Sequence, residues 1–155
     1  MGRLWDKVTG TTHPDSGVAP LPAADVRAAL LAINGPDVPF HIRNALPAEK
    51  ADLVAEWRVP ELKLTLKTRM LLVPENREVR TLDERWEGST RESPGKEYGR
   101  GRSTQVVRKW SYEQGPDGSR QKVETFRFDS RDMRNPLVAA VLEGGWTWRG
   151  VLFKW

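Results

Sequence analysis

The chain contains no cysteine, which excludes disulfide bonds, thiolate metal sites and thiol nucleophiles. Histidine is almost as scarce, because His13 and His41 are the only two in the sequence. We therefore expect no metal site and no cofactor. No apolar run approaches the roughly 18 residues that a membrane-spanning helix requires, and residues 1–22 lack the apolar core of a secretory signal. These absences favour a cytoplasmic protein.

The length of 155 residues suits one domain with a core of its own. Residues 10–22 are small, polar and rich in proline, so they bury too little apolar area to offset the entropy of ordering. We predict a flexible N-terminal head and linker over residues 1–21, and a single domain over residues 22–155. The head carries three apolar side chains that share one face of a helical turn, Leu4, Trp5 and Val8.

A helix is predicted over residues 22–34. Pro22 suits a first helical position, because the N–H that proline lacks would have no helical partner there. The apolar residues that follow have the three- and four-residue spacing of one helical face, and Asn34-Gly35 provides the stop.

A second helix is predicted within residues 130–143, with either Ser130 or Asn135 as its cap. Residues 137–142 leave almost no polar face. We therefore expect this helix to be buried on all sides, and to end at Gly144-Gly145.

Between the two helices the hydrophobic period changes to the two-residue period of strands. The clearest alternation is in residues 62–72, where leucine and methionine share one parity and polar residues the other. Residues 88–101 are interpreted as a long loop, and residues 115–118 (GPDG) as a turn. The other predicted strands lie within residues 40–42, 53–59, 78–86, 105–113, 122–128 and 146–155.

Strands that are joined by tight turns must be antiparallel, and here helices flank a series of consecutive strands. The sequence therefore predicts the α+β class. We expect a curved antiparallel sheet or partly open barrel of about six to seven strands, with an N-terminal helix and a buried helix before the last strand.

Three segments resemble a family of small uncharacterised actinobacterial proteins: residues 51–58 (ADLVAEWR), 72–83 (LVPENREVRTLD) and 144–151 (GGWTWRGV). The resemblance covers most of residues 22–155 and implies no known activity or site. A second similarity, of pattern alone, is to tubby and scramblase-type domains, which wrap a barrel around an apolar helix. It rests on the hairpin at residues 67–80 and the apolar helix that follows it, and it implies a fold likeness only.

The positive charge gathers in one segment. The whole chain has 25 Lys and Arg against 21 Asp and Glu, and residues 100–131 contain eight of the basic and four of the acidic residues. A clustered basic surface attracts phosphates, although the solvated outer face of a hairpin has the same composition. The candidate contacts for an anion or nucleic acid are Arg100, Arg102, Arg108, Lys109, Trp110, Arg120 and Lys122.

Catalytic residues are not evident. Glu56, Asp83 and Glu84 lie in predicted strands, where a carboxylate of polar parity is usually solvated, and His41 is expected to face outward. The sequence contains no nucleophile elbow, phosphate-binding loop or dinucleotide fingerprint. We predict no catalytic, cofactor-binding or metal-ligating residue, while a cleft built from scattered acids and arginines leaves the enzyme class open.

Tryptophan is used seven times. Six of the seven fall in predicted strands, namely Trp57, Trp86, Trp110, Trp146, Trp148 and Trp155. Strand tryptophans either fill the core of a curved sheet or line a pocket or stacking surface. The segment around Trp110 interleaves aromatic and basic residues, a pattern that is typical of stacking on bases and of half-exposed strands alike.

Three functions are compatible with these features. The leading hypothesis is a small non-enzymatic binding or adaptor domain, monomeric because basic edge strands discourage pairing. Its head would dock on a protein partner or a membrane surface. The alternatives are nucleic-acid binding through residues 100–131, and binding of a lipid or other hydrophobic ligand among the tryptophans.

Overall fold

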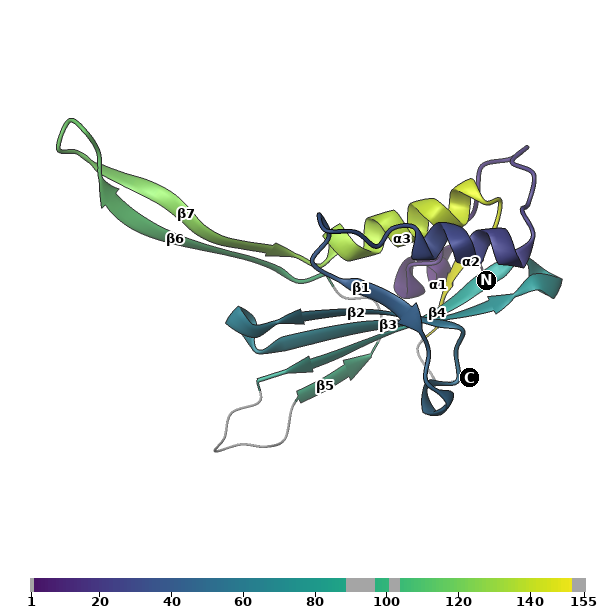
Figure 1. The fold of residues 1–155 in the computed structure, drawn as a ribbon. Helices are drawn as coiled ribbons and strands as arrows, with labels where there is room; N and C mark the ends of the chain where they lie inside the picture. Colours follow the sequence, from purple (N-terminus) through teal and green to yellow (C-terminus); the bar gives the residue numbers. More distant parts are fainter. Residues whose placement is uncertain (1, 89–96, 101–103, 152–155) are drawn as a thin grey trace.

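The computed structural model describes residues 2–88, 97–100 and 104–151. Its body is a six-stranded sheet, covered on one face by helices (Figure 1). The strands follow the order β1-β2-β3-β4-β5, and all of these neighbours are antiparallel. Their bounds are β1 His41–Asn44, β2 Leu53–Val59, β3 Leu64–Val73, β4 Glu78–Glu87, β5 Glu97–Arg100 and β8 Thr147–Gly150.

Strand β4 pairs with β3 along one edge and with two shorter strands along the other. Its first half pairs with β8 in parallel, with Val79 opposite Trp148, and its last four residues pair with β5. The last described strand therefore lies beside β4 at the same edge of the sheet as β5. The sheet stays open, which confirms the predicted α+β class with a mostly antiparallel, unclosed sheet.

Three connections of the sheet use the same short design. Each contains one 3₁₀ turn that begins with proline, and each turn is followed by a basic residue in the left-handed region. Those residues are Lys50, Lys63 and Arg77, with φ between 48° and 50°. Proline fixes the backbone for the first turn position, and the left-handed residue reverses the chain into the next strand. The two turns after β2 and β3 set the registers of long hairpins.

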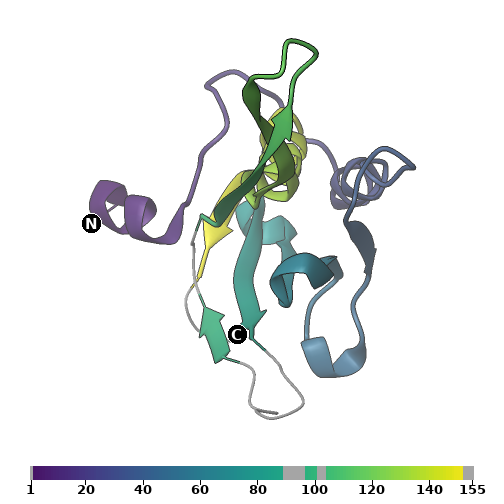
Figure 2. The same ribbon diagram turned by 90° about the vertical axis from the view of Figure 1, so that its left-hand side faces the viewer.

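Helices α2 (Ala23–Leu31) and α3 (Arg131–Glu143) lie over the same face of the sheet, and Figure 2 shows them nearly end-on. α2 buries Val26 and Leu30. α3 buries Met133, Leu137 and Val141. The core is completed by apolar side chains of one strand parity, including Ile42, Leu53, Ala55, Trp57, Leu64, Met70 and Val79.

The N-terminal residues are attached to β8. Helix α1 (Gly2–Thr9) ends beside Gly150, where an added Cβ would lie only 1.9 Å from the Thr9 carbonyl oxygen. Thr12 forms an antiparallel bridge with Trp148. Farther along, the Leu21 N–H donates to the Gly144 carbonyl, and the Leu21 carbonyl accepts from the Trp146 indole. Residues 10–21 thus contact the body at both ends, and their predicted flexibility stays a prediction.

α3 begins at Arg131, so Ser130 takes the N-cap position, one of the two predicted, and Asn135 lies inside the helix. The structure differs from the sequence-based expectations in two details. The helix is buried on one side only, because Asn135, Ala139 and Glu143 are exposed. The segment interpreted as a loop, residues 88–101, contains β5. The remaining elements lie where the hydrophobic period predicts them.

Candidate functional site: the projecting arm

Strands β6 (Val106–Gln114) and β7 (Arg120–Asp129) form a separate two-stranded ribbon, which we call the arm. The arm extends away from the body, to the left in Figure 1. In its turn the Gly115 N–H donates to the Ser119 carbonyl and the Gly118 N–H donates to the Gly115 carbonyl, and Gly118 supplies the positive φ that the turn requires. The Asp117 carboxylate accepts from the N–H and hydroxyl of Ser119. The predicted turn at residues 115–118 is confirmed.

The root of the arm is held by aromatic packing, by two hydrogen bonds and by an ion pair. Phe128 packs edge-on against Trp57 of β2, with ring centroids 4.7 Å apart. The Ser130 N–H donates to the Gln105 carbonyl, and the Gln105 N–H donates to the Ser130 hydroxyl. The Arg131 guanidinium lies 2.7 Å from the Asp129 carboxylate and lowers the pKa of that carboxyl to about 2.

A bulge divides the arm into two halves. Lys109 is opposite Phe126 and Trp110 is opposite Glu124, so Thr125 is the extra residue, and its hydroxyl donates to the Lys109 carbonyl. Strand β6 stays regular because the extra residue belongs to β7. Directly opposite residues share a face, and so do residues two apart along a strand. The register therefore assigns every side chain of the arm to one of two faces.

One face carries alternating aromatic and basic side chains, and we call it the aromatic face. Trp110 is 44% exposed and Tyr112 is 64% exposed. The Lys122 ammonium lies 4.6 Å from the Trp110 ring centroid, and the Arg120 guanidinium lies 5.1 Å from that of Tyr112. The basic and aromatic side chains of this face are Arg108, Trp110, Tyr112, Arg120, Lys122 and Arg127. The same register also places Val106, Gln114, Glu124 and Asp129 on it, with Glu124 directly opposite Trp110.

The opposite face turns toward the body at its root. Phe126 and Phe128 both belong to it, and the Lys109 ammonium lies 5.7 Å from the Phe126 ring centroid. Between this face and the edge of the sheet lies a groove of about 580 Å³, with Phe40, Trp57, Phe126 and Phe128 among its lining residues. The aromatic side chains near the root thus pack between arm and body, whereas Trp110 and Tyr112 remain exposed.

The structure brings together four of the seven predicted basic-segment residues. Arg108, Trp110, Arg120 and Lys122 share the aromatic face, whereas Lys109 lies on the other face. Arg100 belongs to β5 in the six-stranded sheet, opposite Glu84. Arg102 lies outside the described residues.

The predicted head is helical and partly exposed. Leu4 is 79% exposed and Val8 is 54% exposed, four residues apart on one face of α1. Trp5 also belongs to α1, and its side chain lies outside what the structure describes. The Arg134 guanidinium donates to the Gly10 carbonyl and so anchors the residue after the helix to α3. Two apolar side chains therefore face solvent from a helix whose C-terminal end is attached to the body.

Other strand tryptophans are buried. Trp57, Trp146 and Trp148 are at most 8% exposed, and Trp86 is half-buried with the Lys67 ammonium 5.5 Å from its ring centroid. Trp155 lies outside the described residues. Of the five strand tryptophans whose side chains the structure describes, Trp110 alone is classed as exposed.

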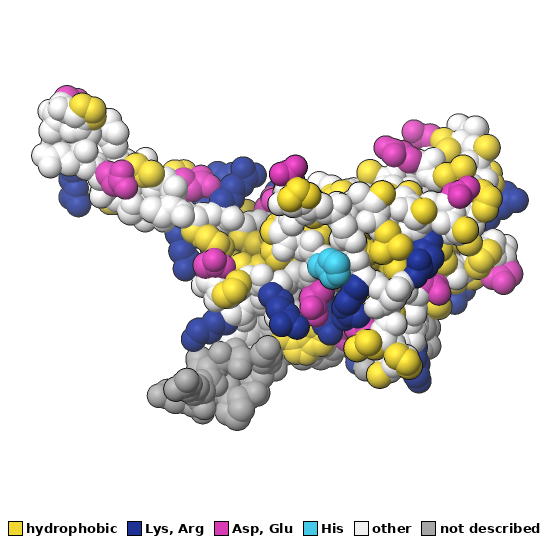
Figure 3. All heavy atoms as spheres, in the orientation of Figure 1, with side chains coloured by type: hydrophobic (Ala, Val, Ile, Leu, Met, Phe, Trp, Pro, Cys, Tyr) yellow, Lys and Arg dark blue, Asp and Glu magenta, His cyan; other side chains and the backbone are white. Residues whose placement is uncertain are grey.

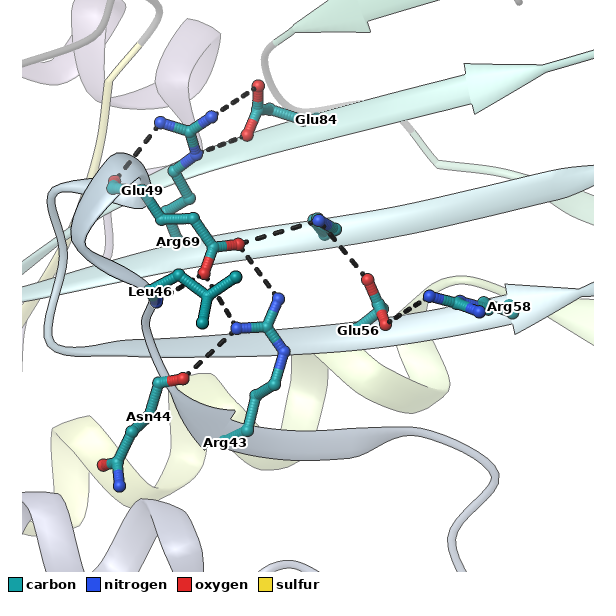
Figure 4. A network of polar contacts seen from close by, with 9 residues as sticks. Arg43, Asn44, Leu46, Glu49, Glu56, Arg58, Arg69 and Glu84 are labelled. Carbon is teal, nitrogen blue, oxygen red and sulfur yellow. Dashed lines mark hydrogen bonds and ion pairs between the residues drawn. The ribbon is translucent and has the colours of Figure 1, made fainter.

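The outer face of the sheet, opposite the helices, contains a network of ion pairs that connects β1, β2 and β3 (Figure 4). The Arg43 guanidinium donates to both carboxylate oxygens of Glu49, at 2.8 and 2.9 Å. The Lys67 ammonium lies 3.6 Å from Glu49 and 3.4 Å from Glu56. A second pair joins Arg69 to Glu84, whose side chain is 1% exposed.

The network holds Glu49 ionised. Hydrogen bonds from Arg43, together with the Leu46 N–H and the nearby Lys67, outweigh burial and lower the pKa of Glu49 from 4.5 to about 2. At the other end of the sheet, burial would raise the pKa of Glu78, but hydrogen bonds from Arg149 and Arg80 lower it overall. Each of these carboxylates is matched to a cation, an arrangement that serves structure.

The three acids that the sequence suggested as solvated are held by partners. Glu56 pairs with Lys67 and Arg58, and Glu84 pairs with Arg69. The Asp83 carboxylate accepts from the Thr68 hydroxyl and lies 3.7 Å from Arg134. Within residues 2–88, 97–100 and 104–151, no group of three or more acidic, histidine or cysteine side chains is arranged to hold a metal ion.

The sequence did not predict the burial of Glu49 and Glu84 or the position of Arg127 on the aromatic face. A signal was available for the pairs, since Arg69 and Glu84 both lie on the polar parity of predicted neighbouring strands. The register that sets them side by side was not predicted. Arg127 lies in the basic segment, and only the bulge at Thr125 places it on the aromatic face.

Comparisons with protein-family models, with curated proteins and with solved structures give no significant match. The resemblances to the actinobacterial family and to tubby-type domains therefore stay predictions. No helix of the described part of the chain is long and apolar enough to cross a membrane.

Proposed function

We propose that this chain is a non-enzymatic binding module, and that the aromatic face of its arm binds single-stranded nucleic acid. The observation that carries the proposal is the exposure of Trp110 and Tyr112 on a projecting ribbon, each ring beside a cation. Burying two such rings against the body would stabilise the fold, yet the arm holds them in solvent. This placement serves a ligand.

The chemistry of the face fits a nucleic-acid strand. Bases stack on aromatic rings whatever their sequence, and nearby cations neutralise the phosphates. Arg108 and Arg127 lie directly opposite each other in register, a like-charge pair that destabilises a free ribbon. A bound phosphate between them would relieve that repulsion.

The first test measures affinity by fluorescence anisotropy, with a short dye-labelled oligonucleotide of mixed sequence. We expect binding that falls steeply with salt. Replacing both Trp110 and Tyr112 with alanine should weaken binding by at least roughly tenfold, since each stacked base contributes about 1–3 kcal/mol. Val123→Ala, which truncates an apolar side chain opposite Ser111 on the other face of the arm, is the matched control and should bind like the wild type.

The charges are tested by the salt dependence. Lys122→Ala combined with Arg120→Ala should make the affinity depend less on salt, by about 0.7 in logarithmic slope per lost phosphate contact. Arg58→Ala, on the body, removes a cation that is 76% exposed and should leave the slope unchanged. Absent binding, or binding that duplex DNA matches, would overturn the single-strand proposal.

A second candidate function concerns the head. The exposed Leu4 and Val8 favour a protein partner for α1, the binding-adaptor hypothesis of the sequence. The double variant Leu4→Ser and Val8→Ser keeps the residues that anchor the helix to β8 and α3. It should lose partners that the wild type retains in a pull-down, and unchanged partners would remove this candidate. Membrane association through α1 and a cytoplasmic location remain predictions.

A further inference from the structure

The outer edge of β6 is a second interaction surface. Among the described residues, β6 pairs only with β7, so one row of its backbone N–H and C=O groups lacks a strand partner. Figure 1 shows the arm standing clear of the sheet. A two-stranded ribbon alone is marginally stable in water, and a third strand stabilises it. Open edges of this kind accept another strand.

The residues of β6 are complementary to themselves when the strand is reversed about Ser111. An antiparallel copy in that register places Lys109 opposite Glu113 and Trp110 opposite Tyr112. Each of these pairs occurs twice because the arrangement is twofold symmetric. Opposite-charge pairs and aromatic pairs are both stabilising when directly opposite, and a small serine sits on the axis.

We propose that two copies of this chain associate through their β6 edges, antiparallel and centred on Ser111, to form a continuous four-stranded ribbon. A closed twofold interface of this kind needs only one surface, which meets itself. The bulge at Thr125 distorts β7 and leaves β6 as the regular edge.

The register also separates the two bodies. Val106 at the root of one arm falls opposite residue 116 of the other, so the roots lie about ten residues apart, or roughly 33 Å at the usual strand rise. The sequence-based expectation of a monomer rested on basic residues at strand edges. In this register Lys109 meets Glu113, so its charge favours pairing instead of opposing it.

Charge-exchange variants test the register by sedimentation velocity. Lys109→Glu places two carboxylates opposite each other at each pair, and Glu113→Lys places two ammonium groups there. Each single variant should raise the dimer dissociation constant about tenfold, from two pairs at up to about 1 kcal/mol each. An equimolar mixture of the two variants should restore dimers, because the mixed pairs are again complementary.

Cross-linking gives a readout that does not depend on affinity. The chain has no cysteine, so Ser111→Cys introduces a single thiol on the proposed axis. Directly opposite Cβ atoms lie about 4.5–5.5 Å apart, close to disulfide reach. Oxidised glutathione should convert this variant to covalent dimers, whereas Ser119→Cys at the arm's turn should stay monomeric.

Three results would overturn the proposal: a wild type that is monomeric at all concentrations, charge variants that dimerise like the wild type, or equal cross-linking at positions 111 and 119. These results are independent of nucleic-acid binding. Dimers that bind no oligonucleotide would contradict only the proposed function, and monomers that bind one would contradict only the pairing.

Discussion

Charged side chains have different neighbours in the six-stranded sheet and in the arm. On the outer face of the sheet, cations and carboxylates face each other, as Arg69 and Glu84 do across neighbouring strands. On the aromatic face of the arm, Lys122 and Arg120 lie against exposed rings. Figure 3 shows side chains of both signs along the arm as well as over the body.

The difference follows from what each region must do to stay folded. The sheet buries its inner face against α2 and α3, and its buried carboxylates need cations because an unpaired buried charge is costly. The arm has almost no core beyond its root, so its side chains are free to serve a ligand. This contrast supports the proposal that the sheet is the scaffold and the arm is the binding element.

The largest expected effect on stability comes from breaking a buried ion pair of the sheet. Glu84→Gln leaves Arg69 facing a neutral amide in a site where the Glu84 side chain is 1% exposed. The free energy of unfolding, measured in urea, should fall by about 3–5 kcal/mol. Glu87→Gln on the same strand removes a carboxylate that is 35% exposed and paired with Arg85, and it should change stability by less than about 1 kcal/mol. Equal losses would contradict the distinction between buried and exposed pairs.

A second prediction compares apolar side chains of the two regions. Leu137 of α3 is fully buried, so Leu137→Ala should lower the free energy of unfolding by about 2–5 kcal/mol. Val106 of the arm is 49% exposed, and Val106→Ala should lower it by at most about 0.5 kcal/mol. Thermal unfolding followed by circular dichroism measures both, and a large loss for Val106→Ala would show that the arm has a core of its own.

A smaller effect is expected on the stability of the fold at acidic pH. The pKa of Glu49 is about 2 in the folded protein and 4.5 ordinarily. Its ionised form therefore stabilises the fold above about pH 4.5, and this contribution is lost as the pH falls from 4.5 toward 2. Glu49→Gln should make stability depend less steeply on pH in that window. Arg43→Gln should do the same, since it removes the hydrogen bonds that lower the pKa.

The alternation of residues 62–72 predicted β3 well, because a sheet with one apolar face imposes that period directly. Long-range pairing is invisible to such a pattern. The parallel pairing of β8 with β4, and the burial of Glu84 beside Arg69, both depend on the register between distant segments. The prediction of a loop over residues 88–101 missed the short strand β5, because the glycine and charged residues of β5 are typical of loops.

The candidate site was also predictable only in part, because local composition identifies a segment but not its pairing register. The basic and aromatic composition of residues 100–131 identified the segment, and the turn at residues 115–118 identified a hairpin. Lys109 lies on the other face because strand alternation separates it from Arg108 and Trp110, and the bulge at Thr125 brings Arg127 onto the same face as Lys122. The local sequence does not predict that bulge.

The central claim is tested most directly by an amide-correlation NMR spectrum of the labelled chain during titration with a short single-stranded oligonucleotide. The indole signals compare the two regions in one sample. We predict salt-sensitive shifts for the Trp110 indole and for backbone amides of β6 and β7, while the buried indoles of Trp57, Trp146 and Trp148 stay in place. An unmoved Trp110 signal, or equal shifts across all four indoles, would contradict the account of the arm as the binding element.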